Sequence, residues 1–218
     1  MELNFKKEIL RKGIHLFSLS FLAIYIIVSD IFNREIALFA LTLLLVILIE
    51  LEYFRIELGD KIGKRIPILN IIWKNLRREK EKDKFWGEIF FLLGCIIVLS
   101  VFDLRIAIAA MLMTTFGDMA SALIGKRFGK SWLGFLPNRA WEGIFAEFFV
   151  NMIVGMIVFS WGNISLIFSW QIWIIVLVMA LTATIVETLI YKLDDNLLMP
   201  VFAGFNGQVV MMILGGMG

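Results

Sequence analysis

Hydrophobic positions are gathered into seven long blocks that polar connections separate. The blocks cover residues 13–29, 35–54, 86–102, 104–124, 140–160, 170–191 and 198–214. Each is close to the roughly 20 residues that an α-helix needs to cross about 30 Å of hydrocarbon. None shows the strict alternation of a β-barrel strand, so the pattern predicts transmembrane helices. The last block is the weakest, because Gly204, Asn206, Gly207 and Gln208 interrupt it.

Composition supports the same interpretation. The chain has 218 residues, of which 60% are hydrophobic and only 18% are charged. A soluble domain of this size could not bury so much apolar surface. We therefore predict an all-α, polytopic integral membrane bundle of about seven transmembrane helices. No internal repeat divides the chain, so we expect a single catalytic domain over residues 1–218.

Lysine and arginine are distributed unequally between the two sides of the predicted bundle. If all seven blocks cross the membrane, every one of these residues except Arg34 and Arg105 falls on the same side. The positive-inside rule then places the N-terminus in the cytoplasm and the C-terminus on the opposite side.

The basic connection at about 55–85 also has apolar residues at helical spacing. We expect an amphipathic helix lying on the cytoplasmic leaflet, divided by Pro67. It would either anchor the connection to anionic headgroups or help to admit a lipid substrate, and the sequence leaves both roles open.

Acidic residues next to the predicted cytoplasmic boundary are candidates for catalysis or metal binding. Asp118 lies in an apolar block, where a carboxylate costs about 2–3 kcal/mol and needs a basic partner, a metal ion or a wet cavity. Asp194 and Asp195 offer the hard oxygen ligands that Mg²⁺ prefers. Glu142 lies in the first turn of a helix, where it interacts with the helix dipole, orients Arg139 or belongs to the metal shell. The intramembrane Glu187 should find its partner among the basic residues of the 126–139 connection.

Basic residues and glycines on the same side are candidates for binding phosphate. Glycines expose backbone N–H groups, and three cations between 125 and 130 supply charge. Asn138 would either cap the following helix or contact the nucleotide. The nucleotide-binding candidates are Gly117, Gly125, Lys126, Arg127, Gly129, Lys130, Asn138, Arg139 and Asn196. Solvated basic residues after a helix are the simpler explanation for this segment.

In their order and spacing, these residues resemble the CTP-dependent lipid kinases. That group includes dolichol kinase, phytol kinase and CTP-dependent diacylglycerol kinase, and is distantly related to phosphatidate cytidylyltransferases. The matching stretches are Glu8–His15, Gly87–Gly94, Gly117–Ser121, Gly125–Lys130, Glu142–Gly143, Glu187 and Asp194–Pro200. One departure is that the family usually has Lys followed by Ser or Thr where this chain has Arg139 and Ala140.

The resemblance implies a kinase that moves the γ-phosphoryl group of CTP to a membrane lipid alcohol. We expect a polyprenol-type acceptor, Mg²⁺ or another divalent cation, and no nucleic acid partner; an oligomer is possible but not inferable. Asp118 and then Asp195 are the preferred catalytic acids, with Glu142 as a third. Asp118, Asp194 and Asp195 are the metal candidates, and Arg11, Lys12, His15 and Glu187 support the site.

Three other functions remain open. A diacylglycerol acceptor would keep the chemistry, and a cytidylyltransferase would make a CDP-lipid. The intramembrane acids Asp118, Glu147 and Glu187 also fit an ion-coupled transporter. The kinase hypothesis requires that Asp118 and Asp195 approach each other closely enough to share one ligand.

Overall fold

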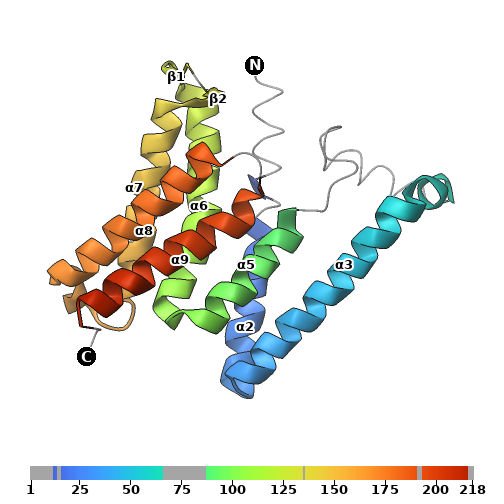
Figure 1. The fold of residues 1–218 in the computed structure, drawn as a ribbon, viewed down its shortest axis with the longest axis horizontal. Helices are drawn as coiled ribbons and strands as arrows, with labels where there is room; N and C mark the ends of the chain where they lie inside the picture. Colours follow the sequence, from blue (N-terminus) through green and yellow to red (C-terminus); the bar gives the residue numbers. More distant parts are fainter. Residues whose placement is uncertain (1–11, 14–15, 66–86, 135, 191–192, 216–218) are drawn as a thin grey trace.

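The computed structural model describes residues 12–13, 16–65, 87–134, 136–190 and 193–215, and of residues 58–65 and 136–138 it describes the backbone alone. Within these ranges the chain is a bundle of α-helices (Figure 1). The helices are α2 (Leu19–Ile31), α3 (Arg34–Arg65), α5 (Gly87–Val101), α6 (Leu104–Phe128), α7 (Trp141–Ser160), α8 (Trp170–Leu189) and α9 (Asp195–Ile213). Two 3-10 turns, η1 (Leu16–Ser18) and η3 (Ile164–Phe168), precede α2 and α8. The all-α prediction is confirmed.

Five of these helices are long and apolar enough to cross a membrane: the part of α3 from Arg34 to Glu57, and α6, α7, α8 and α9. Leu16–Ile31 and α5 are apolar but shorter. Each of the seven predicted blocks therefore contains a helix. Large apolar side chains such as Phe39, Phe149 and Ile157 are exposed on the outside of the bundle, as expected of surfaces that face lipid.

The helices pack so that distant parts of the chain meet. α6 packs most extensively on α7, and α8 on α9, while α9 also contacts α5 and α6. In Figure 1, α3 lies at the edge of the bundle, where it contacts α2 and α5. The end of α8 and the start of α9 lie at the same end of the bundle as the end of α6, and the α5–α6 turn lies at the other. The core between the helices contains Phe91, Phe159, Met111 and Met179.

Several helix ends differ from the predicted boundaries. α6 continues past 124 to Phe128, and α3 continues past 54 to Arg65. Residues 56–65 of the basic connection therefore belong to the same helix as the preceding span, rather than to a separate interfacial helix. The rest of that connection, with Pro67, lies outside the described residues.

A short β-hairpin, which the sequence did not indicate, connects α6 to α7. Its strands are β1 (Trp132–Leu133) and β2 (Leu136–Ala140), paired antiparallel with Trp132 opposite Ala140. The expectation that Asn138 caps α7 is wrong: Asn138 lies in β2, and the residue at the N-cap position is Ala140. The hairpin delivers Arg139 to the bundle immediately before α7 begins.

Candidate functional site

Among the described residues, two ion pairs connect segments that are far apart in the sequence. The Lys12 ammonium contacts the Asp118 carboxylate, and both side chains are largely buried. The Arg139 guanidinium contacts Glu187 twice: Nη1 donates to the side-chain oxygen Oε1, and Nη2 donates to the backbone carbonyl at 2.9 Å. Asp118 thus has the basic partner that its position demanded. The prediction that Glu187 pairs with a basic residue of the 126–139 connection is confirmed.

These two pairs lie in one electrostatic environment, together with Asp195 at the start of α9. The charges of Asp118, Lys12 and Arg139 all act on the Asp195 carboxyl group. Glu187 is influenced by Asp118, Arg139, Lys12 and a further acid, Glu147. We call the six residues Lys12, Asp118, Arg139, Glu147, Glu187 and Asp195 the ionic cluster. The charge of Asp118 therefore acts on Asp195, as the kinase hypothesis expects of two acids at the same end of the bundle.

The charge of Arg139 is set by this cluster. Burial disfavours the guanidinium charge, but the carboxylates of Glu187, Asp118 and Asp195 outweigh burial and hold the pKa of Arg139 above its usual value. Arg139 is therefore a fixed cation among acids. A planar guanidinium with several donors also suits a phosphate group.

The turn before α9 adds another acid, which caps that helix. The Asp194 carboxylate accepts a hydrogen bond from the backbone N–H of Asn196 at 3.1 Å. Burial, followed by the charge of Asp195, raises the pKa of Asp194 to about 6. The first turns of α9 approach α5 closely, because a Cβ at Gly87 would lie 2.8 Å from Asn196 Nδ2 and one at Gly94 only 3.1 Å from Pro200 Cγ.

The basic segment after α6 has a different arrangement from the ionic cluster. Lys126 and Arg127 lie in the last turn of α6, and their side chains, like that of Lys130, are exposed. The Glu142 carboxylate accepts hydrogen bonds from the backbone N–H groups of Lys130, at 3.1 Å, and Ser131, at 3.2 Å. Glu142 therefore fixes the backbone of this segment.

The glycines of this segment differ in role. Gly125 is helical and faces Gly143 across the α6–α7 contact, rather than lying in a loop. Gly129 follows the helix, and its backbone N–H donates to the Gly125 carbonyl at 3.1 Å. A Cβ at Gly129 would lie 2.8 Å from that of the buried Ala140, so the position that departs from the family pattern packs against this glycine.

The structure brings together only some of the candidate residues. Lys12, Asp118, Arg139, Glu187 and Asp195 converge. The exposed cations lie at the end of α6 and just after it, and Glu142 lies in the first turn of α7, where it binds the backbone of Lys130. Arg11, His15 and the side chain of Asn138 lie outside what the structure describes. Within the described residues, no three acid, histidine or cysteine side chains lie close enough together to form a metal site by themselves.

The kinase hypothesis gave no role to three buried polar residues, of which Glu147 was considered only for the transporter alternative. Glu147 and Asn151 on α7, and Thr184 on α8, are buried, and Glu147 acts on Glu187. Their signal in the sequence is the spacing of Glu147 and Asn151, which places two polar side chains on one face of an otherwise apolar helix. A Cβ at Gly117 would collide with the Asn151 side-chain oxygen, so Gly117 makes room for Asn151.

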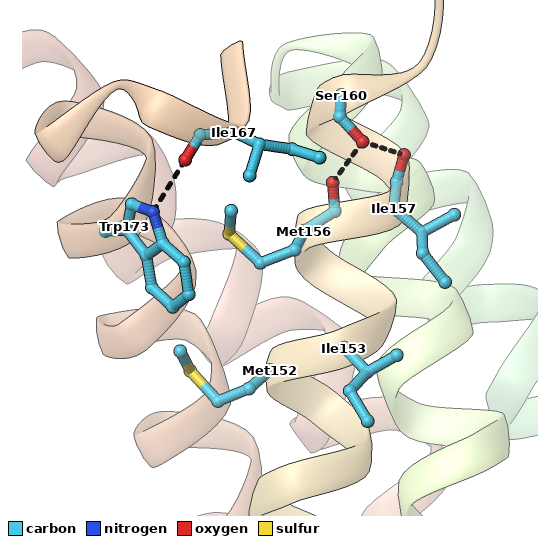
Figure 2. Close-up of a pocket in the computed structure, with 7 residues that line it drawn as sticks. All are labelled: Met152, Ile153, Met156, Ile157, Ser160, Ile167 and Trp173. Atoms are coloured by element: carbon cyan, nitrogen blue, oxygen red, sulfur yellow. Dashed lines mark hydrogen bonds between the residues drawn. The ribbon is translucent and has the colours of Figure 1, made fainter. Parts of the chain in front are cut away.

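A separate apolar pocket lies near the opposite end of α7 from Arg139 (Figure 2). Its volume is about 320 Å³, and Met152, Met156, Ile167 and Trp173 are among the residues that line it. The polar groups there are already paired: Trp173 Nε1 donates to the Ile167 carbonyl at 2.7 Å, and Ser160 Oγ to the Met156 carbonyl at 2.7 Å. No acid or base lines this pocket, so it does not carry the chemistry.

Comparison with characterised proteins identifies three similar enzymes. A CTP-dependent diacylglycerol kinase 1 from Schizosaccharomyces pombe is 27% identical over 165 residues, which cover 71% of this chain and 75% of the relative. A probable chloroplastic phytol kinase from Triticum aestivum is 31% identical over 136 residues, or 58% of this chain. A CTP-dependent diacylglycerol kinase 1 from Eremothecium gossypii is 25% identical over 152 residues, or 68% of this chain.

The match covers 45% of the length of the latter two relatives, less than half of each. No family model and no solved structure matches the chain. These homologues support the CTP-dependent lipid kinase family and so confirm the resemblance seen in the sequence. Together with the apolar helices they support a multi-pass membrane protein.

Proposed function

Because its homologues are CTP-dependent lipid kinases, we propose that this chain transfers the γ-phosphoryl group of CTP to the hydroxyl group of a membrane isoprenoid alcohol, of the polyprenol type. The observation that carries the proposal is the convergence of Asp118, Asp195 and Arg139 from α6, α9 and the hairpin. Phosphoryl transfer depends mainly on positioning and on neutralising charge, which such a mixture of acids and a fixed cation provides.

In the proposed reaction, the alcohol oxygen forms a bond to the γ-phosphorus as the bond from that phosphorus to the β–γ bridging oxygen breaks. CDP leaves, and the hydroxyl proton passes to Asp118, the first choice for the base, or to Asp195. The ion pair with Lys12 would orient the Asp118 carboxylate before the alcohol arrives. The isoprenoid tail stays in lipid, with its hydroxyl at the polar end of the bundle.

Arg139 is the proposed ligand of the triphosphate, with Lys126, Arg127 and Lys130 supplying further positive charge from the hairpin side. Glu142, by binding the backbone of Lys130 and Ser131, would hold that segment in place. Asn138 and Asn196 remain the candidates for contacts with the base.

The acids present fit a Mg²⁺ ion that arrives with the nucleotide. Kinase sites usually hold Mg²⁺ through one or two carboxylates plus substrate phosphates, so a set of three protein ligands is not needed. Asp118, with Asp194 or Asp195, would supply the protein ligands. The ion would neutralise charge that develops on the phosphates during transfer.

The cytoplasmic location of this end of the bundle is part of the proposal. It is supported by the basic residues that the chain concentrates on the same side as Asp118 and Asp195, and it would give the site direct access to cytosolic CTP.

Diacylglycerol is the second candidate acceptor. It is supported by the Schizosaccharomyces pombe relative, which the match covers over 75% of its length and which is a CTP-dependent diacylglycerol kinase. The chemistry and the proposed residue roles would be unchanged, since both acceptors present a hydroxyl group at the membrane surface.

Label transfer with purified protein tests the proposal. The protein would be given γ-labelled or α-labelled CTP together with a polyprenol, phytol, diacylglycerol or phosphatidate. We expect γ-label on the isoprenoid alcohols. γ-Label on diacylglycerol alone would move the acceptor to the second candidate, and α-label on phosphatidate would replace the kinase with a cytidylyltransferase. No labelled lipid from any acceptor would overturn both.

A further inference from the structure

Four buried polar side chains on α7 and α8 have no role in the proposed reaction. Glu147 and Asn151 come from α7, and Thr184 and Glu187 from α8. Glu147 and Asn151 have no exposed surface, and Glu187 is 1% exposed. Such residues are costly inside a membrane bundle unless their polar atoms are paired.

The two acids of this group cannot both be satisfied as carboxylates. Both Glu147 oxygens and Glu187 Oε2 lack a hydrogen-bond donor among the described residues. Arg139 occupies the other oxygen of Glu187. Among the described residues, the Arg139 guanidinium therefore pairs with one buried acid and leaves the second without a hydrogen-bonded cation.

A proton shared between Glu147 and Glu187 would remove one of the two negative charges. The two carboxyl groups act on each other, and a hydrogen bond between them can exist only when one of them carries a proton. Because Arg139 stabilises the ionised form of Glu187, the proton belongs on Glu147. Two adjacent buried carboxylates would otherwise repel each other.

We propose that Glu147 is a protonated carboxylic acid that donates a hydrogen bond to Glu187 and so fixes the Glu187–Arg139 pair in position for the nucleotide phosphates. Glu147 touches neither substrate, and is a positioning residue that acts through Glu187. The link to phosphate rests on the proposed function, whereas the protonation of Glu147 does not.

The charged groups around the pair determine the effect of pH. Asp118 from α6 and Arg139 from β2 act on both acids, and Lys12 acts on Glu187. When alkaline pH removes the proton from Glu147, the second negative charge repels Glu187 and loosens its hold on Arg139. The wild-type protein should therefore lose activity on the alkaline side, with KM for CTP rising.

Infrared spectroscopy tests the protonation without any assay of activity. A protonated carboxyl group has a C=O stretching band that a carboxylate lacks. At about pH 8, far above the ordinary glutamate pKa of about 4.3, wild-type protein should show this band and Glu147→Gln should lose it. Glu35→Gln, which changes an exposed acid on α3, should leave the band unchanged. Absence of a band that depends on Glu147 would overturn the proposal.

Kinetics test the positioning role. The amide N–H of glutamine can donate to Glu187 and does not ionise at alkaline pH. Glu147→Gln should therefore stay within about threefold of wild-type kcat at neutral pH. It should also show no alkaline rise in KM for CTP. Glu147→Leu removes the donor and should raise that KM at every pH. Equal loss in both variants at every pH would contradict the role.

A monovalent cation is the competing occupant of this group. Activity that depends on Na⁺ or K⁺ at constant ionic strength in wild type, but not in Glu147→Gln, would replace the proton with a cation and overturn the proposal. If no acceptor is phosphorylated by the wild-type protein, the proposed function fails, and the infrared result still decides the protonation of Glu147.

Discussion

Arg139 binds Glu187 through two different atoms, one side-chain oxygen and one backbone carbonyl. This geometry uses the planar fork of a guanidinium, and the single ammonium of a lysine cannot reproduce it. The family usually has lysine at this position. The chain therefore combines an arginine with a partner, Glu187, that engages two of its donors.

Replacement of Arg139 by lysine should weaken this contact while keeping the charge. We expect Arg139→Lys to lower kcat/KM for CTP by about tenfold and Arg139→Gln by about 100-fold or more, since charge-assisted contacts to phosphate are stronger than neutral ones. Initial rates of label transfer at varied CTP would measure both. A lysine variant as active as wild type would show that the second contact has no role in catalysis.

Asp118→Asn should separate the proposed base from a structural polar residue. The amide has the same shape but cannot accept the hydroxyl proton, so kcat should fall by about 10²–10⁴-fold, the usual contribution of a positioned base. Expression and the melting temperature in detergent should change little. The matched control is Asp103→Asn, because Asp103 caps α6 and asparagine caps equally well. Equal loss of folding and activity in Asp118→Asn would favour the structural role.

The pKa of Asp194, about 6, predicts how stability varies with pH. Because this value is above that of an unfolded aspartate, about 3.9, ionisation costs more in the folded state. Protonated Asp194 therefore contributes to the free energy of unfolding in full below about pH 4, and this contribution is lost as pH rises to about 6. In metal-free buffer, the melting temperature of the wild-type protein should therefore fall between about pH 4 and pH 6. Asp194→Asn should show a smaller fall, because asparagine does not ionise, and it should still cap α9. An unchanged pH profile in the variant would contradict the assignment.

At the level of elements, the close crossing of α6 and α7 holds the site together. A Cβ at Gly143 would lie 2.7 Å from the Ser121 carbonyl oxygen and 3.2 Å from Gly125 Cα. Both neighbours are backbone, so neither can rotate away. The crossing fixes the distance between Asp118 on α6 and the residues at the start of α7.

Gly143→Ala should therefore force the two helices apart. We expect a loss of about 1–3 kcal/mol in stability, as in other overpacked cores, together with reduced kcat. The control is Gly134→Ala, because a Cβ at Gly134 meets nothing within 4 Å. Thermal unfolding in detergent and label transfer would be measured on both. A Gly143→Ala protein as stable as the control would show that the crossing tolerates a side chain.

The hydrophobic pattern predicted the helices well and their ends poorly. Hydropathy marks where the chain leaves the hydrocarbon. A helix can continue beyond that point as long as the residues there have a high helix propensity. α6 therefore extends through Lys126 and Arg127, which are good helix formers, to Phe128. The hairpin was missed because β1 has only two residues, too few to show an alternating pattern.

Pairing between helices was only partly predictable. The sequence places Asp118 and Asp195 on the same side of the membrane, which was enough to expect them near each other. The basic residues in the 126–139 connection indicated a partner for Glu187. Neither argument identifies which face of a helix meets which neighbour. Glu147 was therefore noted as an intramembrane acid, but its influence on Glu187 was not predicted. Lys12 was not predicted as the partner of Asp118.

For the whole molecule, the main prediction is its orientation in the membrane. Lys130 lies beyond α6 and Trp161 beyond α7, and both side chains are exposed. In intact cells, a membrane-impermeant thiol reagent should label Trp161→Cys and leave Lys130→Cys unlabelled until the cells are opened. The native Cys95 is buried and provides the background control. The reverse labelling pattern would place the ionic cluster outside the cytoplasm and separate it from cytosolic CTP.

The two ion pairs also follow the order in which a ribosome makes the chain. Lys12 precedes Asp118, and Arg139 precedes Glu187. Each acid therefore emerges after its cation is already present. An unpaired carboxylate deep in a bilayer costs about 2–3 kcal/mol on insertion scales. During biogenesis, each acidic helix can thus be neutralised as it enters the membrane, without waiting for a segment that has yet to be translated.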